Sequence, residues 1–207
     1  SERLIKIPGD MDWKRAAVVE PLSGAAYAVE QGKVLPQDAV LIAGAGPVGL
    51  LILLSLKAIG VEKIYVTDLS AGRLEKAREL GATGTADPLE TKIPAWIREA
   101  TGGRGADVAV EAVGAEAALK DCLASVRFKG KVIVQGIFTD RVPIHMLGFV
   151  TRETTMIGTN SINPPLALKW IREQDLRPVL RRGASWGHIP AVVLQGLPFV
   201  APWTLPH

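Results

Sequence analysis

The chain has 207 residues, 48% of them hydrophobic, which is enough to bury one substantial core. Its net charge of +3 comes entirely from Arg177, Arg181 and Arg182, because residues 1–175 hold 21 basic and 21 acidic groups. A body with balanced charge lacks the basic footprint of a nucleic-acid-binding protein, so no nucleic-acid partner is expected.

The first strong pattern along the chain is a strand, a glycine turn, a helix and a second strand, written between Val40 and Asp68. In this stretch Gly44, Gly46 and Gly49 fit G-x-G-x-x-G, which allows a tight turn, close approach of a pyrophosphate and close helix packing. The helix is expected to begin near its proline, and its unpaired N–H groups and positive dipole end would face the phosphates. The pattern therefore predicts a dinucleotide site.

Asp68 indicates which dinucleotide is preferred. It lies 19 residues beyond Gly49, at the end of the apolar run Ile64–Val66. A carboxylate at this place can accept hydrogen bonds from both ribose hydroxyls of adenosine. Because it would repel a 2′-phosphate, we expect NAD rather than NADP.

The uncharged stretch 39–56 has the length of a membrane-spanning helix, which is the alternative interpretation of this part of the chain. Three glycines and a proline interrupt its middle, with β-branched residues clustered before the turn and leucines after it. This arrangement is typical of a buried strand that leads into a buried helix. No membrane partner is expected.

The remaining elements alternate between helices and strands. Helices are predicted over 70–80, 90–100 and 115–126, and strands over 84–86, 107–113, 131–137 and 154–158. Pro94 puts the first turn of the second of these helices in question. Alternation of this kind indicates βαβ units and an α/β fold, namely a Rossmann-type doubly wound parallel sheet with three layers, α/β/α.

Taken together, these residues resemble the zinc-dependent medium-chain dehydrogenase/reductase family, especially its butanediol, sorbitol and threonine dehydrogenase branch. The similarity runs from about residue 12 to residue 170 and rests on several motifs in one order. They are VVEPLSGAAYAV at 18–29, VLIAGAGPVGL at 40–50, VTDLSAGRLEKARELGA at 66–82, GADVAVEAVG at 105–114, GKVIVQGI at 130–137 and RETTMIGTN at 152–160.

The resemblance implies which residues would contact NAD. They are Gly44, Gly46, Pro47, Val48 and Gly49 at the phosphates, Asp68 and Arg73 at the adenosine, Val113 and Gly114 beside the cofactor, and Gln135, Gly136, Ile137, Gly158 and Thr159 at the nicotinamide half. An exposed helical charge is the alternative interpretation of the arginine.

The resemblance further implies hydride transfer between a secondary alcohol or polyol and NAD, with zinc polarising the alcohol oxygen. Family members bind this zinc in an N-terminal catalytic domain, which this sequence is expected to lack. Neither Cys nor His occurs before Cys122, and only Glu20 matches a position beside the metal. One carboxylate does not hold zinc, and a solvated charge before a helix is the alternative interpretation. We therefore expect NAD binding, no zinc binding, and little or no turnover by this chain alone.

The sequence also has to be compared with other functional classes. A non-catalytic NAD(H)-binding regulatory module would use the same fold. A short-chain dehydrogenase is disfavoured, because neither Tyr27 nor Tyr65 is followed by lysine four residues later. A methyltransferase is disfavoured because the later motifs do not match. His145 and His188 fit no metal motif and are interpreted as surface or packing residues.

Three regions are expected: residues 1–35 as a remnant bordering the catalytic domain, 36–162 as the NAD-binding Rossmann domain, and 163–207 as a helix followed by an atypical tail. Residues 176–207 contain no Asp, Glu or Lys, which suggests a segment foreign to the fold. A single cysteine, interpreted as a buried helix residue, and no visible leader predict a cytoplasmic protein. A homo-oligomer is expected to form through the strand at 154–158.

Overall fold

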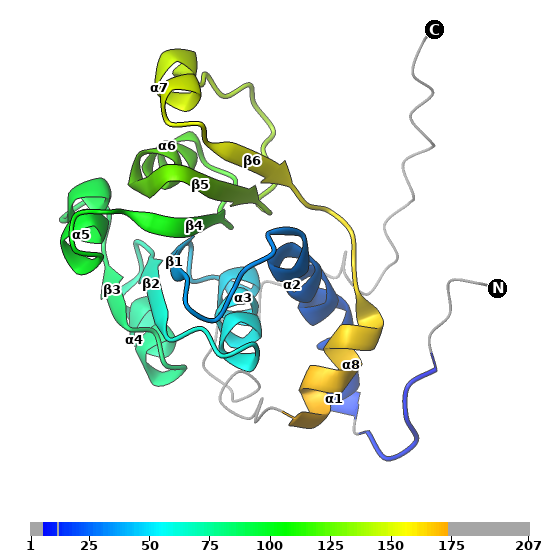
Figure 1. Ribbon diagram of the computed structural model, residues 1–207. Helices are drawn as coiled ribbons and strands as arrows, with labels where there is room; N and C mark the ends of the chain where they lie inside the picture. The colour runs from blue at the N-terminus through cyan, green and yellow to red at the C-terminus, as the bar shows by residue number, and fades with distance from the viewer. Residues whose placement is uncertain (1–5, 12, 174–207) are drawn as a thin grey trace, which may run out of the picture.

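The computed structural model describes residues 6–11 and 13–173, which form a sheet covered by helices on both faces (Figure 1). Within these residues one six-stranded parallel sheet has the order β3-β2-β1-β4-β5-β6. The strands are β1 Ala39–Ala43, β2 Lys63–Thr67, β3 Gly84–Ala86, β4 Ala106–Glu111, β5 Val126–Val134 and β6 Thr155–Gly158. The order reverses between β1 and β4, so the predicted doubly wound Rossmann-type fold is confirmed.

The helices divide between the two faces of the sheet. They are α1 Trp13–Ala16, α2 Val19–Gln31, α3 Pro47–Ala58, α4 Ala71–Glu79, α5 Ile93–Ala100, α6 Glu116–Ser125, α7 Met146–Thr151 and α8 Pro164–Glu173. One apolar cluster joins α2, α3, α4 and α8 to the sheet, and a second joins α5 and α6 to its other face. The three layers follow from right-handed crossovers that change direction at the switch point.

Successive residues of β1 point to opposite faces of the sheet, and both faces are covered, which explains why all of them are apolar. Val40 and Ile42 belong to the first cluster, whereas Leu41 and Ala43 belong to the second, and all four are buried. A strand buried on both faces needs apolar residues at successive positions. The uncharged run 39–56 is thus β1, a turn and most of α3, and the described residues contain no helix long and apolar enough to span a membrane.

Several predicted boundaries were wrong by a few residues. The helix predicted from residue 90 begins at Ile93, with Pro94 in its first turn, where a missing N–H leaves no hydrogen bond unmade. The strand predicted over 131–137 begins at Val126, directly after α6, and ends at Val134. The strand predicted to reach residue 113 ends at Glu111. Neither α1 nor α7 was predicted.

The segments on either side of the sheet domain pack against each other. Asn163 donates from its backbone N–H to the Ser23 carbonyl at 3.0 Å, and its Nδ2 donates to Glu30 Oε2 at 2.9 Å. These bonds tie α8 to α2, and both helices share the first apolar cluster. The division at residues 35 and 162 stays a prediction. The predicted helix after residue 163 is α8, and residues 176–207 lie outside the described part.

Strand β6 forms the edge of the sheet beyond β5. Thr155 and Met156 of this strand are exposed. An exposed edge has unpaired N–H and C=O groups that can pair with another strand. Association of two copies through this edge stays a prediction.

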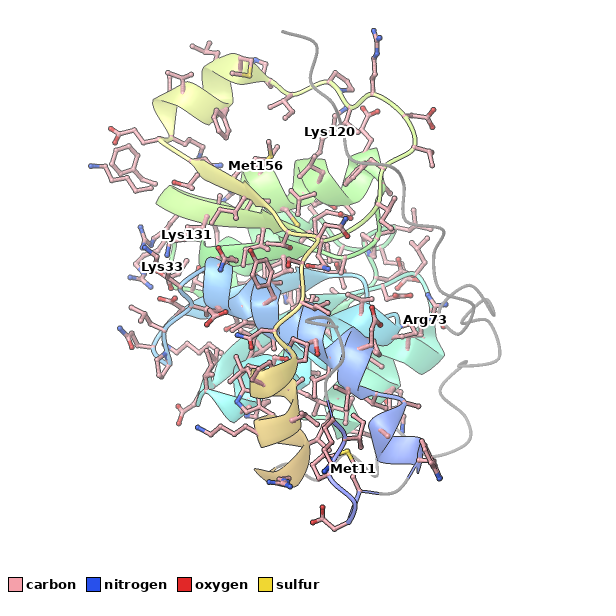
Figure 2. All side chains as sticks on the ribbon, turned by 90° about the vertical axis from the view of Figure 1, so that its right-hand side faces the viewer. Met11, Lys33, Arg73, Lys120, Lys131 and Met156 are labelled. Carbon is pink, nitrogen blue, oxygen red and sulfur yellow. The ribbon has the colours of Figure 1, made fainter. Side chains whose placement is uncertain are left out.

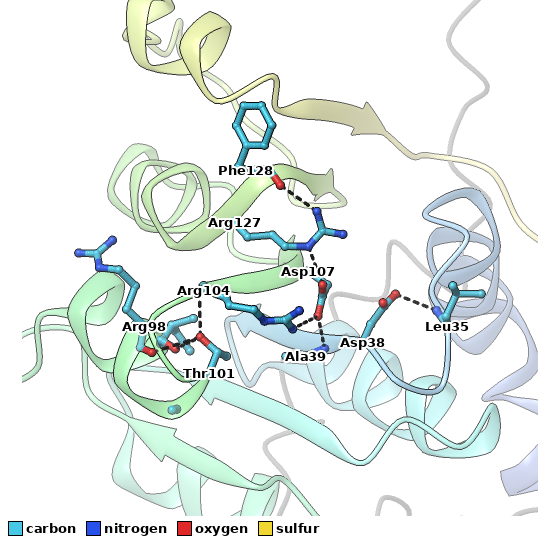
Figure 3. Close-up of polar contacts among 12 residues, drawn as sticks. Leu35, Asp38, Ala39, Arg98, Thr101, Arg104, Asp107, Arg127 and Phe128 are labelled. Carbon is cyan, nitrogen blue, oxygen red and sulfur yellow. Dashed lines mark hydrogen bonds and ion pairs between the residues drawn. The ribbon is translucent and has the colours of Figure 1, made fainter.

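A buried aspartate joins the starts of three strands (Figure 3). Asp107 of β4 accepts hydrogen bonds from the Ala39 N–H at 2.9 Å and from Arg127 Nε at 2.6 Å, while Arg104 lies at 3.4 Å. Burial acts to raise the pKa of Asp107, but these hydrogen bonds and the two arginine charges outweigh it, so the pKa is lowered. The ionised carboxylate therefore stabilises the amino-end edge of the sheet.

Replacing Asp107 with Asn should lower the free energy of unfolding by about 2 kcal/mol at neutral pH, because charged hydrogen bonds are lost. With a folded-state pKa below the ordinary value, this contribution is fully present above about pH 4 and disappears as the pH falls through the folded pKa. Urea unfolding of both proteins at several pH values measures the difference. The half-buried Asp38 at the same edge, replaced with Asn, is the control, and a deficit that does not shrink in acid would contradict the assignment.

Candidate functional site

A cavity of about 790 Å³ opens at the carboxyl ends of β1, β2 and β4. This is the place where the strand order reverses, and doubly wound sheets bind their ligands at that point. The volume lies in the range of small-molecule and cofactor sites. Of the residues predicted from sequence, those that line it are Gly44, Gly46, Pro47, Asp68, Arg73 and Val113.

The glycine turn brings the start of α3 close to the end of β1. Gly44 has φ of +103°, and its N–H donates to the Thr67 carbonyl at 2.7 Å, which joins the ends of β1 and β2. A Cβ at Gly49 would lie 1.9 Å from the Gly44 oxygen, so only hydrogen fits between them. A Cβ at Gly46, in contrast, would meet no protein atom within 4 Å.

The amino end of α3 faces the cavity without a side-chain cap. Gly46 is the N-cap residue and offers no side-chain acceptor, and Pro47 follows as the first helical residue. Helix amino ends have unpaired N–H groups and a positive dipole end, which together bind anions. The open space at Gly46 and this uncapped end fit a phosphate group.

Asp68 lies directly beside this turn, at the end of β2. Its Oδ2 accepts from the Ala45 N–H at 2.8 Å and its Oδ1 accepts from the Ser70 N–H at 2.9 Å. Arg73 of α4 reaches to 3.7 Å from Oδ2, while half of its own side chain stays exposed. Each carboxylate oxygen keeps a second lone pair, so Asp68 can accept two further hydrogen bonds from a ligand.

Three large apolar side chains on the walls of the cavity are exposed, among them Leu89 after β3. Leu69 follows Asp68 and is 63% exposed, and Val113 follows β4 and is 54% exposed. Large apolar side chains exposed in a cavity mark a surface that a ligand can cover. Val113 was predicted as a cofactor contact, whereas Leu69 was missed, although an apolar residue next to the predicted ribose acceptor is a usable signal.

A buried glutamate shapes the turn after β4. Glu111 has no exposed surface, and its Oε1 accepts from the Val113 N–H at 2.9 Å and the Gly114 N–H at 2.8 Å. A Cβ at Gly136 would lie 2.3 Å from Glu111 Oε2 and equally close to the Gly114 nitrogen. The turns after β4 and β5 are therefore packed backbone to backbone. Sequence reasoning missed Glu111, because a single acid in an apolar strand has no distinguishing pattern.

The other predicted nicotinamide contacts lie further along the same edge. Thr159 donates from its N–H to the Val134 carbonyl at 3.0 Å, and its hydroxyl lies 2.5 Å from Gln135 Oε1. This pair joins the carboxyl ends of β5 and β6. Gln135, Gly136, Ile137, Gly158 and Thr159 thus lie at the carboxyl-end edge but outside the cavity lining, as do Val48, Gly49 and Gly114.

Figure 2 shows labelled cations on both sides of the molecule. Arg73 lies on one side of the molecule, whereas Lys33 and Lys131 lie together on the other. Lys131 donates to the Gly32 carbonyl at 2.8 Å, which links β5 to the end of α2. Among the described residues that line the cavity, the cations are Arg73 and Lys76.

Among the described residues, no cluster of metal-binding side chains surrounds the predicted metal residue. Glu20 is exposed in the first turn of α2, within the helix rather than before it. The part of the chain that the structure describes contains no group of three or more His, Cys, Asp or Glu side chains able to hold a metal ion. His145 caps α7, because its Nδ1 accepts from the Gly148 N–H at 3.2 Å, and this is a structural role. These residues do not fit zinc.

Comparison with known proteins decides the family. The family model described as zinc-binding dehydrogenase matches residues 47–178. The chain belongs to the zinc-binding dehydrogenase family. It is 38% identical over 158 residues to (R,R)-butanediol dehydrogenase of Bacillus subtilis (strain 168), covering 76% of this chain and 45% of that enzyme.

A second relative and a crystal structure agree with this family. Sorbitol dehydrogenase of Mus musculus is 32% identical over 186 residues, which cover 87% of this chain and 46% of that enzyme. The crystal structure of 2R,3R-butanediol dehydrogenase from Bacillus subtilis superposes with a TM-score of 0.79 at 34% identity, covering 85% of this chain and 51% of the other. The chain spans about half the length of the relatives it matches.

The two glycines of the turn should respond differently to alanine. Gly49→Ala should lower the free energy of unfolding by about 3 kcal/mol, because the new methyl group would overlap the Gly44 carbonyl. Gly46→Ala should cost about 1 kcal/mol or less, because its methyl group has free space and only the N-cap preference changes. Urea unfolding measures both, and equal losses would contradict this account of the turn.

Proposed function

We propose that this chain supplies the NAD-binding part of an alcohol or polyol dehydrogenase. The observation that carries the proposal is the carboxylate of Asp68 beside an uncapped helix end, within one cavity at the switch point. These two groups match the two polar parts of a dinucleotide, a ribose diol and a pyrophosphate. Membership of the zinc-binding dehydrogenase family supports the same assignment.

The proposed cofactor follows the edge of the sheet. The pyrophosphate lies at Gly46 and the amino end of α3, and the adenosine ribose donates to Asp68. The adenine ring lies between the exposed side chains of Leu69 and Val113. The nicotinamide half extends toward the ends of β5 and β6, where Gly136 and Thr159 offer backbone carbonyls, since their N–H groups donate within the protein. In this pose Gly46, Asp68 and Val113 contact the cofactor, whereas Gly49 packs against the Gly44 carbonyl.

We propose NAD rather than NADP on electrostatic grounds. A 2′-phosphate would approach the carboxylate of Asp68, whose oxygens already carry negative charge in a partly buried place. Arg73 is a possible phosphate partner, but its guanidinium lies 3.7 Å from that same carboxylate. The diol of NAD, which donates two hydrogen bonds, suits the free lone pairs better.

The proposed reaction is hydride transfer between a secondary alcohol or polyol and the nicotinamide ring. NAD supplies the hydride chemistry when bound, and the residues of this chain bind and orient it. The described residues do not fit the family's zinc, so no step is assigned to a metal. We propose that this chain alone binds NAD and turns over little or no alcohol.

The binding proposal is tested by titrating NADH into the purified chain and following fluorescence. Saturable binding is expected, and no response at about millimolar NADH would contradict the proposal. Asp68→Ser should weaken NADH about tenfold while leaving NADPH nearly unchanged, because the lost interaction is a charged hydrogen bond to the diol. Asp38→Ser is the control, since Asp38 also accepts a backbone N–H but lies at the opposite edge. An unchanged preference would remove Asp68 from this role.

The proposed lack of turnover has its own assay. The purified chain is incubated with NAD and 2,3-butanediol or sorbitol, with and without added zinc, and absorbance of NADH is followed. We expect no rate above that of a protein-free blank, because the described residues do not form a metal site. Turnover that depends on zinc would show a metal site formed by this chain.

A further inference from the structure

One carboxylate on the cavity wall has no part in the site described so far. Asp121 lies on α6, on the same helix face as Ala117 and Ala118, and all three line the cavity. Pro88 and Leu89, which follow β3, line the same part of the cavity and share an adjoining hollow with Asp121. The two small alanine side chains leave room in front of this carboxylate.

The Asp121 carboxylate is partly buried and has no partner in the described part of the chain. No hydrogen bond or ion pair reaches it there. Burial raises the pKa of Asp121, and no nearby positive charge offsets this effect. Lys92 and Arg98 line the adjoining hollow without pairing with it. A desolvated carboxylate without a partner gains from a hydrogen-bond donor that a ligand brings.

The proposed pose of the cofactor indicates which of its parts comes near Asp121. In the proposed pose the helix end at Gly46 binds the pyrophosphate, Asp68 binds the ribose, and the base lies between Leu69 and Val113, all of which line the cavity. Asp121 lies on α6, five residues beyond Glu116, the first residue of this helix, and lines the same cavity together with Pro88 and Leu89. The base reaches this wall with the edge that points away from the ribose. In adenine that edge has an exocyclic amino group, which is a hydrogen-bond donor.

We propose that Asp121 accepts a hydrogen bond from the exocyclic amino group of adenine and makes the site prefer adenine over a 6-oxopurine. This inference rests on the proposed dinucleotide function and identifies the residue that reads the base. In the orientation in which adenine donates its amino group, a 6-oxo group would direct its lone pairs at the carboxylate, so Asp121 would oppose hypoxanthine bound in that orientation. Asp121 is thus a specificity-determining residue, whereas Leu69 and Val113 accept either base.

The experiment compares NADH with reduced nicotinamide hypoxanthine dinucleotide, which differs from it at the 6-position of the base. The wild-type chain should bind NADH at least about tenfold more tightly, in line with a charged hydrogen bond. Asp121→Ala and Asp121→Asn should bind the two dinucleotides within about twofold of each other. Asn can accept from the amino group or donate to the oxo group. The Asp121→Asn variant should therefore lose its preference by binding the hypoxanthine dinucleotide more tightly than wild type does.

Glu116→Gln is the matched control, because it removes a carboxylate from the same helix outside the cavity lining and should keep the wild-type preference. Both Asp121 variants remove an unpaired, partly buried charge, so they should fold, which their unfolding curves check. Equal binding of the two dinucleotides by wild type, or a preference that survives in both variants, would overturn the role of Asp121 alone. Absence of binding to either dinucleotide would overturn the proposed function as well.

Discussion

The close contact between Gly49 and the Gly44 carbonyl is the constraint on which the site depends. With a Cβ only 1.9 Å from that oxygen, any larger residue would push α3 away from β1. The contact holds the amino end of α3 at the carboxyl end of β1, where the strand order reverses. It also explains why Gly44 takes a positive φ, since the chain must turn within a few residues from strand to helix. The anion-binding property of the helix end follows from where this contact places it.

Acidic side chains then hold the turns on both sides of that point. Asp68, at the end of β2, accepts the Ala45 N–H of the glycine turn, and Glu111, at the end of β4, accepts two N–H groups of the next turn. Asp107 plays the corresponding part at the opposite edge, where arginines surround it. Asp107 and Asp68 differ in how much hydrogen-bond acceptor capacity remains for a ligand. Asp107 is occupied by protein partners, whereas Asp68 keeps lone pairs that face a cavity.

Much of this could be predicted from sequence, because β1, the glycine turn, α3 and β2 each have a distinct local pattern. The apolar run of β1, the spacing of Gly44 and Gly49, and the acid after β2 are local features that need no tertiary information. Glu111 could not be predicted, since its importance depends on the fit of Gly136 against it, 25 residues along the chain. The start of β5 was missed because α6 passes into it without a turn residue. The position of Asp121 in the cavity wall could not be predicted either, because it depends on how α6 packs beside the residues that follow β3.

The central claim is that a dinucleotide binds along the carboxyl-end edge of this sheet, with its pyrophosphate at the amino end of α3. Amide chemical shifts of the isotope-labelled chain, recorded by NMR during addition of NADH, test it most directly. The account predicts shifts at Gly46, Val48, Ser70 and Gly114, with Ala39 at the opposite edge unchanged. Shifts confined to the Ala39 edge, or none at saturating NADH, would contradict it.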